Sequence, residues 1–312
     1  MNPKKFGPYL VLIAAMLWAT DAPFRLHLTQ SLSSNFIVLA EHFIDILFVL
    51  PILIWSFKDL KGLSWKRWLA IIVIAVGGSA LASIAFTQAF KYVNPSVAIL
   101  LQKLQPLLAI SLAASLLKES INRFFWLWSL IAMFGAYLIS FPNFVPRLFE
   151  GEQFNPNLIG VLLALAAALL WGASTVMGRY VLQKIDFKLM TSLRFVIAFI
   201  FLLIINLTTK SIPQLSTVTG KDWFYLGIIA VTSGVVSLFI YYRGLQYTKA
   251  SVATIAELGF PLAAVLINFV FLDAKLLPVQ IFGMAVLLYG VFRLSRLNGV
   301  EEIAREAIPI TS

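Results

Sequence analysis

LIAAMLWA, residues 12–19, has a near-copy in LAAALLWG, residues 165–172. Both stretches are apolar and uncharged, and each is typical of the middle of a helix that crosses a bilayer. The first, which follows Lys4 and Lys5, could also belong to a signal peptide, but a copy in the middle of the chain could not. We therefore interpret both stretches as membrane spans.

The repeat extends beyond these two stretches. The shift of 153 residues that aligns them also places Glu41 on Arg194. A shift of 155 residues aligns Pro106 with Pro261, and residues 134–137 (FGAY) with residues 289–292 (YGVF). Trp, Pro and Gly positions that stay in register over whole halves argue for a duplicated unit.

Composition indicates a membrane protein. The 312 residues are 60% hydrophobic and 12% charged, with a mean hydropathy of +0.91, whereas soluble domains carry about 25% charged residues. The absence of cysteine excludes disulfides, thiolate metal sites and cysteine catalysis. Since about 20 apolar residues span a bilayer, we expect an all-α membrane protein with ten transmembrane helices. They are predicted near residues 7–26, 35–57, 67–90, 95–117, 124–142, 157–180, 187–208, 221–246, 250–272 and 278–296.

Basic residues predict the orientation. The predicted spans divide the chain into segments that lie alternately on the two sides of the membrane. Of the 24 Lys and Arg residues, sixteen lie in segments on the same side as the N-terminus and six, including Arg25, lie in segments on the opposite side. Lys103 and Arg194 lie within spans. The positive-inside rule then predicts cytoplasmic termini in a bacterial inner membrane. The same rule accounts for the net charge of +10, so we expect no nucleic-acid partner.

Five spans per half is an odd number, so the second half must enter the membrane in the opposite sense. Inverted repeats of this kind recur in secondary transporters. We predict a first five-helix repeat at 1–142, an external linker at 143–156, a second repeat at 157–298 and a cytoplasmic tail at 299–312.

The sequence resembles the EamA-like branch of the drug/metabolite transporter superfamily over nearly its whole length. The resemblance rests on the Leu-Trp-Ala/Gly turns, Arg194-Phe195, residues 106–109 (PLLA), Lys118-Glu119 and the helix around Gly135. It implies a secondary active transporter that exports amino acids or other small metabolites by alternating access, without a cofactor and as a monomer or homodimer. A lipid-linked sugar flippase component is the alternative.

Ionisable groups within spans are costly unless they are paired or hydrated, so they are the first candidates for function. They are Asp21, Glu41, His42, Asp45, Lys103, Arg194 and Glu257.

Lys103 lies between Gln102 and Gln105, just ahead of Pro106. A proline at this position leaves the carbonyl of Gln102 without its helical donor, and transporters bind solutes where helices are broken. Glu257, also ahead of a proline, is the repeat partner of Gln102. We predict that these four residues bind substrate. A fixed Lys103–Glu257 ion pair, or a lysine that snorkels to the interface, is the alternative.

Glu41 and Asp45 are four residues apart and share a helix face. Two carboxylates this close in a low dielectric repel each other, which favours proton uptake by one of them. Glu41, Asp45 and Glu257 are therefore our candidates for proton coupling, with simple hydration as the alternative. We expect Arg194 and Asp21 to be structural charges. Trp18 and Trp171 could stack on a flat substrate or serve as ordinary anchors.

An enzyme is not expected. The only histidines, His27 and His42, lie on different segments, so the two-histidine helix face of a metalloprotease is missing. We find no nucleophile elbow, phosphate loop or dinucleotide fingerprint, and predict no metal or cofactor.

Overall fold

A computed structural model describes most of the chain, and the described part is almost wholly helical. It covers residues 3–105, 107–108, 111–112, 123–141, 143–144, 149–150, 153–182, 184–246, 256–257 and 259–307. Pro106, Lys118 and Glu119, which carried part of the sequence interpretation, lie outside these residues.

Six helical segments of the described part are long and apolar enough to cross a membrane. They are α1–α2 (Pro3–Ala19, Ala22–Leu28), α3 (Ser34–Trp55), α4–η2–α5 (Trp65–Ile72, Val73–Leu81, Ala82–Ala89), α9 (Pro156–Leu182), α10 (Phe187–Thr208) and α11–η4–α12 (Gly220–Ile229, Ala230–Val236, Ser237–Gln246). Shorter helices are α6 (Pro95–Gln102), α8 (Phe125–Ser140) and α14 (Gly259–Leu272), and in α15 (Pro278–Ala307) only the first part, Pro278–Arg293, is apolar. Large apolar side chains such as Trp55 and Phe271 are 84% and 72% exposed, as expected of surfaces that face lipid. The prediction of an all-α, multi-pass membrane protein is confirmed; the count of ten spans stays a prediction.

Three predicted boundaries differ from the structure. Helix α6 ends at Gln102, and Lys103 and Leu104 form a turn within the span predicted at 95–117. Helix α15 continues to Ala307, past the apolar stretch, because the predicted tail consists largely of good helix formers such as Ala, Glu and Arg. The predicted linker contains an antiparallel β-hairpin of two short strands, β1 (Phe149–Glu150) and β2 (Gln153–Phe154).

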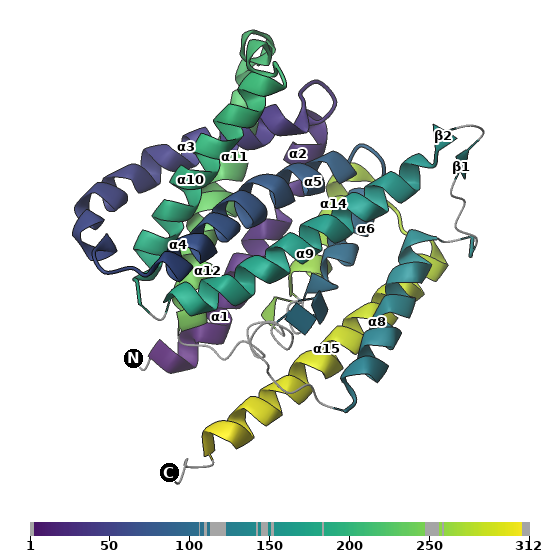
Figure 1. Cartoon of the computed structure of the whole chain (residues 1–312). Coiled ribbons are helices and arrows are strands. Elements are labelled where there is room, and N and C mark those ends of the chain that lie inside the picture. The colour runs from purple at the N-terminus through teal and green to yellow at the C-terminus, as the bar shows by residue number, and fades with distance from the viewer. Residues whose placement is uncertain are drawn as a thin grey trace.

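Helices α8 and α15 lie side by side in Figure 1. A Cβ on Gly135 would come within 2.5 Å of the Leu287 backbone nitrogen, and one on Gly290 within 3.0 Å of the Ala132 backbone nitrogen. Gly135 and Gly290 are repeat partners, and the same shift of 155 relates Ala132 to Leu287. The two contacts are therefore reciprocal, and only glycine allows the two backbones to approach this closely.

The third and eighth predicted spans each contain a π-helix, η2 and η4. Such segments are rare and concentrate at functional sites. Each is held by the helix that carries a Leu-Trp turn: the Trp171 indole donates to the Gly78 carbonyl at 2.8 Å, and the Ser233 hydroxyl donates to the Leu17 carbonyl at 3.2 Å.

The first helix starts and the last helix ends at the same end of the bundle. In Figure 1 the start of α1 and the end of α15 lie at the lower left, and the β1–β2 hairpin lies at the opposite end. Between the two ends, α1, α3, α5, α9, α10 and α12 surround the interior that contains the candidate site.

Candidate functional site

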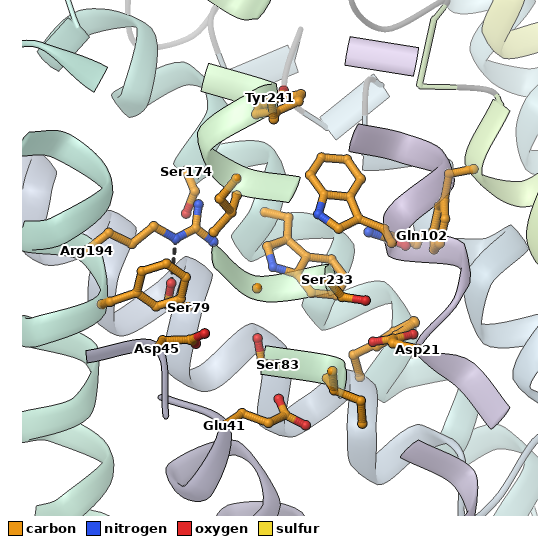
Figure 2. Close-up of a pocket in the computed structure, with 18 of the residues that line it drawn as sticks. Asp21, Glu41, Asp45, Ser79, Ser83, Gln102, Ser174, Arg194, Ser233 and Tyr241 are labelled. Atoms are coloured by element: carbon orange, nitrogen blue, oxygen red, sulfur yellow. Dashed lines mark hydrogen bonds between the residues drawn. The ribbon is translucent and has the colours of Figure 1, made fainter. Parts of the chain in front are cut away.

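A cavity of about 170 Å³ lies in the interior, lined by helices from both halves of the chain. Figure 2 shows its polar side chains pointing inward from several different elements. The candidate residues from the sequence all line it: Trp18, Asp21, Glu41, His42, Asp45, Gln102, Lys103, Gln105, Trp171, Arg194 and Glu257.

Arg25, which the sequence analysis placed in an outer segment, is a buried member of the cavity wall and is 6% exposed. Its Nε donates to Asp21 at 3.0 Å, and its terminal nitrogens reach Thr87 at 2.7 Å and Glu41 at 3.1 Å. Helix α2 begins just after Asp21, and Arg25 on this helix lines the cavity. The (i, i+4) spacing of Asp21 and Arg25 was the signal that could have revealed this ion pair.

Arg194 on α10 is also buried, but its guanidinium bonds only to neutral acceptors. It donates to the Ser79 hydroxyl, to the Tyr242 hydroxyl at 2.8 Å and to the Gly78 carbonyl at 3.3 Å. Two of these acceptors belong to η2, so Arg194 ties this π-helix to α10. Within the described residues, no carboxylate oxygen lies within 4 Å of its nitrogens.

Asp45 lies one helical turn beyond Glu41 on α3 and is 2% exposed. Its Oδ1 has no hydrogen-bond partner among the described residues. The carboxylate packs on η4 so tightly that a Cβ on Gly234 would lie 2.6 Å from Oδ1. Figure 2 shows Asp45 on the side of the cavity where Arg194 bonds to Ser79.

Lys103 follows the last residue of α6 as its C-cap, and its ammonium lies 4.5 Å from the centroid of the Phe260 ring. Glu257 accepts a hydrogen bond from the Tyr241 hydroxyl at 2.8 Å. Lys103 and Glu257 face the same cavity, but within the described residues no ion pair shorter than 4 Å joins them. The lysine therefore retains donors that a ligand could use, and a cation–π contact holds it in place.

Amide and aromatic side chains complete this side of the cavity. Gln102 Oε1 is buried without a donor among the described residues, and Gln105 donates to Thr175 at 3.2 Å. The Trp18 ring lies 5.1 Å from Tyr241, and Trp171 lies 5.2 Å from Phe86. Flat apolar faces beside unpaired polar atoms suit a ligand that is aromatic and polar at once.

His42 also lines the cavity. Its Nδ1 lies 2.9 Å from the Val38 carbonyl and its ring packs on Phe195, while its Nε2 is buried without a hydrogen-bond partner among the described residues. Within the part of the chain that the structure describes, no three His, Cys, Asp or Glu side chains gather as a metal site would require.

The sequence pattern of the EamA-like transporter family matches this chain twice, at residues 5–141 and 158–296. A protein of Fusobacterium nucleatum called riboflavin transporter ImpX is 31% identical over 94% of this chain and 98% of its own length. The uncharacterized transporter YetK of Bacillus subtilis is 24% identical over 93% of this chain and 87% of its own. A solved crystal structure resembles the fold with a TM-score of 0.65 at 15% identity, covering 94% of this chain and 97% of the other.

Proposed function

Because this chain belongs to the EamA-like transporter family, we propose that it carries a small, flat, polar aromatic metabolite of the riboflavin type across the bacterial inner membrane. The observation that carries the proposal is the cavity, which both halves of the chain build and which joins aromatic faces to unpaired polar atoms. The described cavity is smaller than the roughly 300–1,000 Å³ of ordinary ligand sites. A substrate of this size would enter only when the helices move apart.

Alternating access between two inverted repeats is the mechanism that we propose. The reciprocal contacts of α8 with α15 support it, since a twofold axis produces such pairs. Further support comes from the two π-helices, one in each half, and from the chain ends at one end of the bundle, which an even number of spans requires. We propose ten spans, with repeats at 1–142 and 157–298, an external linker at 143–156 and cytoplasmic termini.

The substrate class is supported by the cavity and by the relative. Trp18 and Trp171 occupy equivalent positions in the two repeats and would stack on opposite parts of a ring system. Lys103 and Gln102 offer a donor and a free acceptor at the edge of such a ring. The riboflavin transporter of F. nucleatum shares 31% identity over nearly its full length, which favours a flavin-like ligand over the amino acids that the sequence analysis proposed.

Transport by purified protein tests the proposal. Full-length protein in liposomes should exchange labelled riboflavin for unlabelled riboflavin, and unlabelled amino acids should not compete. Competition by amino acids with no riboflavin exchange would return the substrate to the original prediction. Exchange of neither would reject both substrate classes.

Direction is measured in the same vesicles. An alternating-access carrier runs in either direction as its gradients dictate, and the family resemblance implies export. Inside-out and right-side-out vesicles, each given a pH gradient, should show whether accumulation corresponds to export.

Reporter fusions at Gln153 and after Arg305 should place the hairpin outside and the C-terminus inside, and an active cytoplasmic reporter at Gln153 would contradict ten spans.

A further inference from the structure

Asp45 is the one cavity carboxylate described with an unsatisfied oxygen and no ion pair. The two oxygens of Glu41 both face Arg25, at 3.1 Å each, and Asp21 pairs with the same arginine. Glu257 has the Tyr241 hydroxyl. An ionised carboxylate that is buried without a donor is strongly unfavourable, so Asp45 requires a proton, a cation or a partner that moves to it.

The charged side chains of the cavity wall favour the binding of one additional positive charge. The cavity is lined by three cations, Arg25, Lys103 and Arg194, and by the four carboxylates Asp21, Glu41, Asp45 and Glu257. If all were ionised, the wall would carry a net charge of −1. A single proton on Asp45 makes the wall neutral and also removes the unpaired buried charge.

A metal cation fits the same place poorly. Cations such as Ca²⁺ take six or more oxygen ligands, and sodium likewise needs several oxygens around it. Near Asp45, Glu41 is already bonded to Arg25, while the Ser79 hydroxyl and the Gly78 carbonyl already accept from Arg194. The Gly234 backbone packs directly against Oδ1. A proton needs only the carboxylate itself.

The charged and titratable groups around Asp45 are known from each helix packed against it. They are Glu41 and His42 on its own helix, Arg25 on α2 and Arg194 on α10, while η4 presents Gly234 and Ser233. Arg194 is the cation among these that is bonded only to neutral acceptors, so it alone could change partner without leaving another charge unpaired.

We propose that Asp45 is the proton-binding group that couples transport to a pH gradient, with Arg194 as the element that responds to it. The structure shows Arg194 bonded to η2 through Ser79 and Gly78, and we assign this arrangement to the form with a proton on Asp45. When the proton leaves, the ionised carboxylate attracts the guanidinium away from η2. The π-helix then loses its tie to α10, and the substrate-loaded repeats do not change their relative position until Asp45 takes up a proton again.

This proposal rests on the proposed function and narrows its coupling to one residue. Glu41 and Glu257, the other sequence candidates, already have partners in the structure. Asparagine at position 45 imitates the protonated carboxyl in size and charge. Asp45→Asn should therefore fold, and it should keep riboflavin exchange at equal pH while it loses the ability to use a pH gradient.

The experiment compares two assays on full-length protein in liposomes. Asp45→Asn should keep riboflavin exchange within about twofold of the wild type and lose at least tenfold in accumulation driven by a pH gradient. Asp273→Asn, on an exposed loop where its carboxylate pairs with Lys275, is the matched control and should change neither assay. Accumulation by Asp45→Asn at the wild-type level, or accumulation driven by sodium instead of protons, would overturn the proposal.

Infrared difference spectra between acidic and alkaline buffer give a readout that needs no substrate. The carbonyl band of a protonated carboxyl should appear in the wild type and disappear in Asp45→Asn. A band that persists in the variant would place the proton elsewhere. Failure of Asp45→Asn to fold would also overturn the proposal, because the neutral form would then not be native. If wild-type protein exchanges no riboflavin, the proposed substrate fails while the spectra still decide the proton site.

Discussion

Arg25 and Arg194 are both buried arginines of one cavity, yet their surroundings are opposite. Arg25 is held by two carboxylates and a threonine hydroxyl. Arg194 is held by two hydroxyls and a backbone carbonyl. A buried ion pair is strongly unfavourable to break from one side, whereas hydrogen bonds to neutral groups exchange at lower cost. The first arrangement suits a fixed support and the second a part that moves.

The largest effect should come from breaking the fixed support. Arg25→Met leaves Asp21 and Glu41 as unpaired buried charges, which costs about 3–5 kcal/mol of folding free energy. Arg194→Met leaves only neutral acceptors unpaired, for about 1–3 kcal/mol. The midpoint of thermal unfolding in detergent, together with the monodisperse fraction, measures both.

A triple variant sharpens this prediction. Arg25→Met combined with Asp21→Asn and Glu41→Gln carries no unpaired charge and should recover most of the lost stability. Equal losses for Arg25→Met and Arg194→Met would remove the distinction between the two arginines.

Lys103→Met should have a smaller effect on folding and a clear effect on transport. Its ammonium rests on Phe260, and Glu257 keeps its bond to Tyr241 without it. We expect well-folded protein with riboflavin exchange reduced at least tenfold, about 1.4 kcal/mol of binding. Lys103→Arg, which keeps the charge and the ring contact, is the matched control.

Other outcomes for Lys103→Met would support the alternatives from the sequence. Misfolding that is rescued by adding Glu257→Gln would indicate a fixed ion pair between the two residues. Normal folding with normal exchange would leave the lysine as one that only snorkels.

The sequence predicted which charged residues lie within the spans better than it predicted the hydrogen-bond partners of those residues. The depth of Arg194, Lys103 and Glu41 within apolar spans follows from hydropathy, and all three line the cavity. The acceptors of Arg194 come from Ser79 and Tyr242, which are distant in the chain and were not foreseen. Such contacts depend on how helices pack, and no local pattern encodes that packing.

Arg25 shows a different limit. A basic residue near the end of an apolar stretch looks like the start of a loop, because averaged hydropathy cannot distinguish a charge in water from one neutralised by neighbours.

Helix ends show a third limit: α6 stops at Gln102 inside an apolar stretch, while α15 continues past the end of its apolar stretch. The proline expected to break α6 lies outside the described residues, so its part in this ending stays a prediction.

The smallest effect should come from Ser79→Ala, which removes one neutral acceptor of Arg194. With one partner fewer on η2, the guanidinium turns more readily to ionised Asp45, so the deprotonated state becomes relatively more stable. The pH of half-maximal exchange, measured with equal pH on both sides, should then move to lower values. A hydrogen bond from a charged donor contributes about 1.5–3 kcal/mol. One pH unit corresponds to about 1.4 kcal/mol. The contact of Arg194 with ionised Asp45 replaces part of the energy lost with the Ser79 hydrogen bond, so we expect the pH of half-maximal exchange to shift by about one unit or less. Ser83→Ala, which also changes the cavity wall but removes no acceptor of Arg194, should leave the profile in place. A profile that stays unchanged in Ser79→Ala, or that moves to higher pH, would mean that Arg194 does not respond to Asp45 and is as fixed as Arg25.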